Sequence, residues 1–205
     1  MRNAFAILPL ILVAGLAAPA LAEEQATPPA ADQAQPTEPA KPEQTREQRL
    51  DSLFGQLKRE RNEKAAERIA GQIWEEWFQS GSASVDLMMQ WAQHAMEQQK
   101  YDVALDFLDE VITLQPSYAE GWNRRATVNF MMSNYAKSMS DIDHTLALEP
   151  RHFGALSGMA QILKNTGKKE LALKAYQRVL DIYPMMRSAQ NEVATLSEEL
   201  AGEGI

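Results

Sequence analysis

Three prolines at a constant spacing constrain this chain more than any other feature of its sequence. Pro116, Pro150 and Pro184 stand 34 residues from one another. A fixed period of this size is typical of solenoids built from helix–turn–helix units. Because three evenly spaced prolines can arise by chance, the interior positions of each unit must repeat with the same period if the interpretation is correct.

The interior positions do repeat. Positions 24 and 12 residues before each proline carry small side chains, which allow two helices to cross closely: Ala92, Ala126 and Ala160, then Ala104, Ser138 and Ala172. Bulky side chains recur in the same register: Met88, Trp122 and Leu156, then Leu108, Ile142 and Tyr176. Small and large residues therefore alternate with one period, as expected for stacked helix pairs that share a continuous core.

This pattern resembles the tetratricopeptide repeat, whose order is a Trp, a small residue, an Ala, an aromatic residue and a Pro. The best local match runs from Tyr118 to Pro150. The chain departs from the family at Trp91 and Arg125, where Leu is usual, and at Ala95 and Asn129, where Tyr is frequent. The resemblance implies a right-handed superhelix of about three helix pairs.

The fold class predicted for the rest of the folded region is also all-α, because apolar residues recur at helical spacing from residue 45 to residue 200 and no strand-length alternation appears. The expected parts are a degenerate helix pair at 46–82, repeats at 85–118, 119–152 and 153–186, and a capping helix with its tail at 187–205. Within the repeats, turns are expected at 99–101, 133–135 and 166–168.

The N-terminus predicts export. Residues 1–22 combine Arg2, an uncharged apolar stretch and the small-residue ending Ala20-Leu21-Ala22, as in a cleaved signal peptide. This predicts a periplasmic protein with no membrane insertion after cleavage; the alternative is an uncleaved anchor in the inner membrane. Residues 23–45 are rich in Pro, Ala and Gln, so we expect a disordered tether, with a Pro-rich ligand segment as the alternative.

Composition and motifs argue against nucleic-acid binding, catalysis and metal binding. The net charge is −8, which disfavours binding to a phosphate backbone, and the chain has no cysteine for disulfides or thiol chemistry. His94, His144 and His152 lack metal-site spacing and are expected at the surface. We therefore predict no catalytic residues, no metal and no cofactor; the paired methionines are assigned to the core and to an adaptable surface rather than to copper binding.

The expected function is protein binding. In tetratricopeptide-repeat proteins the first helix of each repeat lines a concave groove. Carried over by register, the expected partner-binding residues are Met89, Gln93, Asn123, Arg124, Thr127, Phe130, Ser157, Gly158 and Gln161, beside Asp86, Gln90, Met96 and Lys164. A mixed groove with Met89 or Phe130 exposed suits an extended or helical peptide with apolar anchors.

Chaperone-binding family members hold a C-terminal carboxylate in this groove with Lys, Asn and Arg side chains. Here Met89, Gly154 and Gly158 occupy positions that need such groups, and only Asn123 and Arg124 resemble part of the clamp. The first hypothesis is therefore an adaptor in the cell envelope that binds a partner peptide of another kind.

The alternative is a structural accessory subunit of an envelope complex that docks through the aromatic cluster of the N-terminal pair: Trp74, Trp77 and Phe78.

Overall fold

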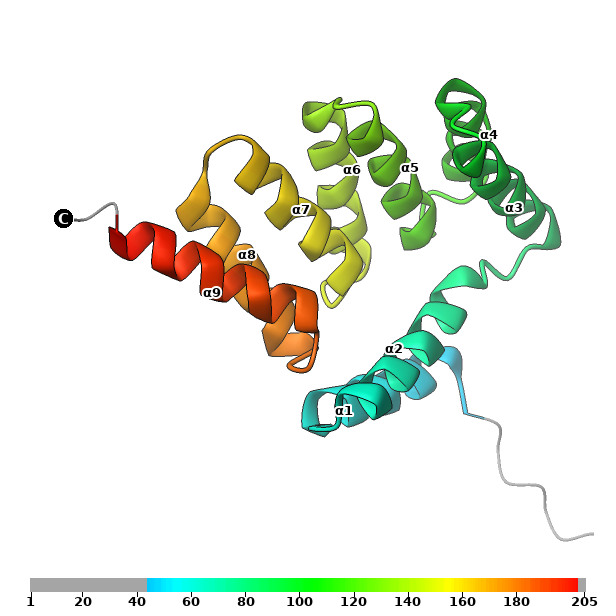
Figure 1. Ribbon diagram of the computed structural model, residues 1–205. Coiled ribbons are helices and arrows are strands. Elements are labelled where there is room, and N and C mark those ends of the chain that lie inside the picture. The colour runs from blue at the N-terminus through cyan, green and yellow to red at the C-terminus, as the bar shows by residue number, and fades with distance from the viewer. Residues whose placement is uncertain (1–43, 203–205) are drawn as a thin grey trace, which may run out of the picture. The chain divides into compact units, whose positions relative to one another are not determined.

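The computed structural model describes residues 44–202, and these residues form nine helices without a strand. The helices are α1 (Arg46–Arg59), α2 (Glu63–Phe78), α3 (Ala83–Glu97), α4 (Tyr101–Leu114), α5 (Ala119–Met131), α6 (Tyr135–Leu148), α7 (Phe153–Asn165), α8 (Lys169–Ile182) and α9 (Arg187–Gly202). Successive pairs α3–α4, α5–α6 and α7–α8 stand side by side in a row that α9 continues (Figure 1). The predicted all-α helical repeat is confirmed; the signal peptide and most of the tether lie outside the described residues.

The 34-residue period has a physical basis in the way each second helix ends. Gln115, Glu149 and Tyr183 are the C-cap residues of α4, α6 and α8, and a proline follows each of them. Their backbone leaves the helical region, with φ between −141° and −124°. The residue before a proline is sterically pushed toward this extended conformation, so each proline stops its helix at the same point.

The turn inside each repeat also recurs with the period. Gln99, Ser133 and Gly167 stand 34 residues apart and adopt positive φ of 58°, 60° and 74°. The next amide in each turn donates to a carbonyl five residues back, as Lys100 N does to Ala95 O at 2.9 Å. This left-handed helix ending suits glycine best, and only the third repeat has one. Tyr101 and Tyr135, expected in the first and second turns, instead begin α4 and α6.

The small residues lie where the helices of a pair cross. Ala92, Ala104, Ala160 and Ala172 are completely buried. In the second repeat Ser138 replaces the alanine, and its hydroxyl donates to the Ala126 carbonyl at 2.8 Å across the crossing. A buried hydroxyl needs such a partner, so the polar substitution is accommodated without an unsatisfied group.

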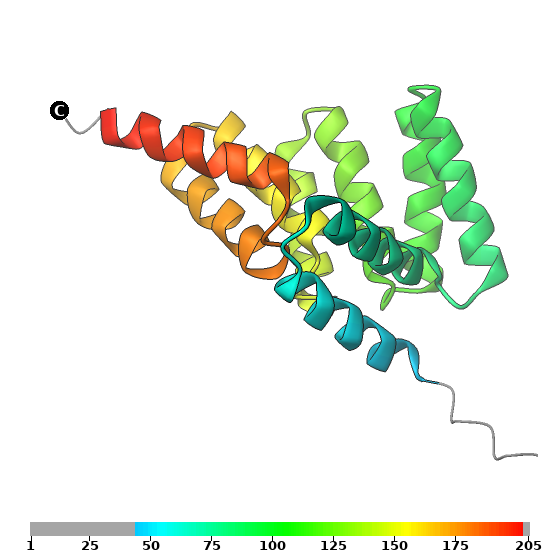
Figure 2. The same ribbon diagram turned by 60° about the horizontal axis from the view of Figure 1, so that its bottom comes forward.

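The N-terminal pair does not stack on α3 and α4 as a preceding repeat. Instead α1 packs against α8, and α2 packs against α5 (Figure 2). Leu57 and Ile73 share one buried cluster with Leu156, Val179 and Leu196, of α7, α8 and α9. Two helices therefore occupy the segment where a degenerate pair was expected, but they dock along the row of repeats rather than stacking at its start.

The pair runs along the loops that join successive repeats. At the first loop, Tyr118 Oη donates to the Phe78 carbonyl at 3.0 Å. At the second, Arg151 forms an ion pair of 2.6 Å with Asp51. At the last, Arg187 pairs with Glu63, also at 2.6 Å. Since the two ion pairs are largely exposed, they contribute little. Burial of apolar surface supplies most of the free energy that holds the N-terminal pair on the repeats.

Candidate peptide-binding groove

The expected partner-binding residues lie in two hollows rather than in one continuous lining. Met89, Gln93 and Arg124 line a hollow of about 700 Å³ between the end of α2, α3 and α5. A second hollow of about 270 Å³ lies between α5, α6 and α7. It is lined by the other six: Asn123, Thr127, Phe130, Ser157, Gly158 and Gln161.

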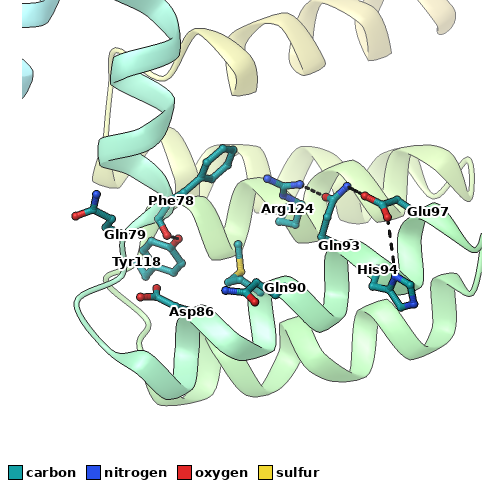
Figure 3. Close-up of a pocket in the computed structure, with 10 residues that line it drawn as sticks. Phe78, Gln79, Asp86, Gln90, Gln93, His94, Glu97, Tyr118 and Arg124 are labelled. Atoms are coloured by element: carbon teal, nitrogen blue, oxygen red, sulfur yellow. Dashed lines mark hydrogen bonds and ion pairs between the residues drawn. The ribbon is translucent and has the colours of Figure 1, made fainter.

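The larger hollow combines apolar and amide side chains. Phe78 lines one side, while Gln90 and Gln93 line another from α3 (Figure 3). Phe78 is 44% exposed, so its ring is available to a ligand. Met89 is only 8% exposed, which corrects the expectation that this side chain projects as an apolar anchor. Its contacts with the α3–α4 core cover most of it.

Arg124 is held firmly in this hollow. Its guanidinium donates to Glu120 Oε1 at 3.0 Å and to the side-chain oxygen of Gln93, and it lies 5.2 Å from the Phe78 ring centroid. The side chain is 19% exposed. With the nearby Glu120 carboxylate compensating its charge, Arg124 shapes the wall of the hollow and is a weak attractor for an acidic ligand.

Glu120 organises a buried polar network that the sequence did not reveal. It is 1% exposed, and its Oε2 lies 2.9 Å from Asn123 Nδ2 and 3.1 Å from His152 Nε2. The Asn123 side chain is therefore committed to the interior, although it lines the second hollow. A buried carboxylate requires several such partners to offset its loss of hydration.

His152 is fully buried, so its expected surface position is wrong. Its Nδ1 accepts a hydrogen bond of 3.0 Å from Ala155 N and caps α7, and its ring stacks on Trp77 at 4.0 Å between centroids. The 34-residue register offered a signal, because the equivalent residue in the preceding repeat is Tyr118, which is 3% exposed. The residue that corresponds to Glu120 in the next repeat is Gly154, so nothing in the sequence indicated that Glu120 is buried.

Tyr118 is fixed beneath the larger hollow. Burial, reinforced by the nearby carboxylates of Glu120 and Asp86, raises the pKa of Tyr118 well above its ordinary value. The hydroxyl therefore remains protonated over the physiological range and keeps donating to the Phe78 carbonyl. This hydrogen bond ties the end of α2 to the first inter-repeat loop.

The smaller hollow offers mainly apolar surface. The hydroxyls of Thr127 and Ser157 donate to Asn123 O and Phe153 O at 2.9 and 2.8 Å, one helical turn back. Phe130 is partly buried and packs against Tyr135, with ring centroids 5.7 Å apart. These hydroxyls already have acceptors, so a ligand here would chiefly meet methyl groups and ring edges.

Trp74 closes part of the inner surface. A Cβ atom built on Gly154 would lie 2.7 Å from Trp74 Cη2, so the indole sits directly on this glycine. Gly154 is one of the positions that require a polar or basic residue in the carboxylate clamp. The chain therefore lacks the clamp side chain and covers its position with its own helix α2.

The aromatic cluster expected as an alternative docking surface is largely occupied within the chain. Trp77 is 3% exposed and contacts His152 and Phe153, and Trp74 is partly buried between the same two residues and Phe78. Of the three, only Phe78 is exposed, and it belongs to the larger hollow.

Residues 44–202 contain no group of three His, Asp or Glu side chains placed to hold a metal. His144 is exposed, as expected, and stacks on Trp122 with ring centroids 4.2 Å apart. Within the same residues, no helix is both long and apolar enough to cross a bilayer.

The helix pairs, their period and the lined inner surface define a helical-repeat protein of the kind that presents a groove to other molecules. No family model matches the chain. It is 62% identical over 155 residues to a TPR repeat-containing protein of Rhizobium etli, and the match covers 76% of each chain. The chain therefore belongs to the tetratricopeptide-repeat (TPR) family.

More distant similarities agree. The chain is 30% identical over 117 residues to the small glutamine-rich tetratricopeptide repeat-containing protein 2 of Saccharomyces cerevisiae. This match covers 57% of this chain but only 34% of the yeast protein. Among solved structures, the first TPR of Spaghetti (RPAP3), bound to the HSP90 peptide SRMEEVD, superimposes with a TM-score of 0.56 at 28% identity. It covers 58% of this chain and 95% of that domain.

Proposed function

We propose that the chain is an exported TPR adaptor of the cell envelope that binds a peptide segment of a partner protein in its groove. The observation that carries the proposal is the hollow of about 700 Å³ beside α3, with an exposed Phe78 ring and the amides of Gln90 and Gln93 on its walls. An apolar surface with a few polar groups is what a peptide-binding groove requires. The peptide-bound TPR structure with 28% identity supports the same use of the fold.

The proposed ligand has an apolar anchor side chain and no acidic cluster. Arg124 is already paired with Glu120, while Asp86 and Glu97 add negative charge to the lining of the hollow. Trp74 covers the clamp position at Gly154. Acidic C-terminal tails are therefore disfavoured both by charge and by the lack of a carboxylate clamp.

Photo-crosslinking in intact cells tests the groove. A photo-reactive amino acid placed at Gln90 should capture a discrete partner, whereas the same residue at Gln177, exposed on α8, should not. Mass spectrometry of the crosslinked peptides then gives the bound segment. Equal capture from both positions would contradict the groove assignment.

The synthetic peptide SRMEEVD tests the specificity. It is the ligand of the similar Spaghetti (RPAP3) domain, and we expect no saturable binding to this chain below about 1 mM. Micromolar binding would contradict the proposal that Trp74 and the compensated Arg124 disfavour acidic tails.

The proposal of export rests on residues 1–22 and is tested separately. The mature protein should be recovered from the periplasmic fraction with Glu23 as its first residue. Recovery from the inner membrane with the apolar segment still attached would instead favour the anchored form. The accessory-subunit alternative has less support, since Trp74 and Trp77 already pack inside the chain.

A further inference from the structure

The first repeat presents an outer face whose equivalents in the other repeats are covered. Gly121 and Ala155, at the register position of Leu87, are both buried against the preceding repeat. Asp141 and Ala175, at the position of Phe107, are each 3% exposed. This face of α3 and α4 is therefore a repeat-stacking surface, continuous in register with the two interfaces already present in the row.

Nothing in residues 44–202 stacks on this face, since the N-terminal pair packs along the loops instead. Leu87 is 43% exposed and Trp91 is 48% exposed, although Trp91 packs partly on the Phe107 ring, 5.4 Å away. Val103, also 43% exposed, borders this face beside Trp91 and Phe107, although its register position stays exposed in the third repeat, where Leu171 is 49% exposed. A contiguous apolar face of this kind marks an interaction site.

The face carries a projecting ring beside a hollow. Trp91, Val103 and Phe107 line a space of about 380 Å³ next to the exposed indole. Its charges are mixed along α4, with Lys100 at one end and Asp106 and Glu110 further along. In a two-fold arrangement, antiparallel α4 helices would bring Lys100 of each copy toward the acidic residues of the other, which is favourable.

The opposite end of the row does not complement this face. There α9 buries Ala189 and Leu196 and turns Asn191, Ser197 and Glu198 outward. A head-to-tail contact would therefore place apolar side chains against a polar helix. Packing of the face on its own copy avoids this mismatch and closes the assembly.

We propose that the outer face of α3 and α4 is a self-association surface, on which two copies pack Leu87, Trp91 and Phe107 against the same residues of each other. Helix α3 has 15 residues and is therefore about 22 Å long, and two neighbouring helices are about 18 Å wide. Each copy then contributes about 400 Å². The total of about 800 Å² lies at the small end of protein interfaces, so we expect a weak, reversible dimer.

Sedimentation equilibrium tests this surface. The sample is the full chain, purified in the form in which the cell processes it. The wild type should fit a monomer–dimer equilibrium, and Trp91→Lys should raise the dissociation constant at least about tenfold. The matched control is Leu171→Lys, at the position of Val103 in the third repeat, 49% exposed but away from this face. Circular dichroism should show unchanged helicity for both variants, because both side chains are half exposed.

Two results would overturn the proposal: a monomer at every concentration up to about 1 mM, or a dimer weakened equally by both substitutions. A second variant, Leu87→Lys, should also weaken the dimer. It shows whether the effect belongs to the whole face or only to Trp91. Filling the groove with Gln90→Trp should leave the dimer unchanged, so the failure of this proposal and that of the groove remain distinguishable.

Discussion

Two glycines on α7 offer a direct test of how the N-terminal pair sits on the repeats. Gly154 and Gly158 lie one helical turn apart, and replacing either by alanine removes the entropic cost of a helical glycine, about 0.5–1 kcal/mol. At Gly158 the new methyl would lie 3.5 Å from Ile142 Cδ1, an ordinary contact. We therefore expect Gly158→Ala to stabilise the fold by about 0.5–1 kcal/mol.

At Gly154 the new methyl would meet Trp74 Cη2 at 2.7 Å and Cζ2 at 3.0 Å. The indole cannot move freely, because it is stacked on Phe78 and lies edge-on to Trp77. Overpacking of this kind costs about 1–3 kcal/mol. Set against the gain in helix propensity, Gly154→Ala should lower the free energy of unfolding by up to about 2 kcal/mol.

Urea denaturation followed by circular dichroism gives both free energies, and the two variants should differ by about 1–3 kcal/mol. A double-mutant cycle sharpens the test. With Trp74→Ala already present, Gly154→Ala should lose most of its cost, and only the closer contact with His152 Cε1, at 3.3 Å, should keep it less favourable than Gly158→Ala. If both alanines stabilise the wild type equally, Trp74 does not lie on Gly154, and the proposed coverage of this part of the groove is refuted.

Three further predictions concern the turns, the buried network and alkaline pH. Gln99→Gly and Ser133→Gly should each raise the free energy of unfolding by about 0.5–1 kcal/mol in urea melts, since both residues adopt positive φ; a loss would contradict the left-handed turns. Glu120→Ala should cost about 3 kcal/mol by the same assay, because it leaves a buried histidine without its partner, whereas exposed Glu110→Ala should change stability by less than about 0.5 kcal/mol. Tyr118 has a pKa raised by burial, so its contribution is fully present below pH of about 10 and is lost as the pH rises above that value. Tyr118→Phe should therefore flatten the decline of the thermal midpoint at alkaline pH; an unchanged slope would argue against this burial.

The repeat architecture was predictable because its determinants are local and periodic. A proline stops the second helix of each repeat at the same position. A small residue at each crossing lets the two helices approach closely, so that the Ser138 hydroxyl can donate a hydrogen bond to the Ala126 carbonyl of the other helix. Each of these constraints acts within one unit and recurs in the next. Agreement between register and packing is therefore expected wherever a repeat is intact.

The placement of the N-terminal pair was not predictable, because it depends on contacts between distant segments. The helical periodicity of α2 shows that Trp77 belongs to a buried face, but it does not show that the face meets His152. The pair could have stacked on α3, as a preceding repeat would. The same applies to the groove: register placed Met89 and Phe130 in the lining, while their exposure depends on how the surrounding side chains pack.

The affinity of the segment identified by crosslinking is the most direct measurement of the central claim, that the hollow beside α3 binds a partner peptide. Fluorescence anisotropy of the labelled synthetic segment should give saturable binding to the wild type. Gln90→Trp, which fills the hollow, should weaken binding at least about tenfold, and Gln177→Trp on α8 should leave it unchanged. Unaltered affinity of the Gln90→Trp variant would contradict the claim.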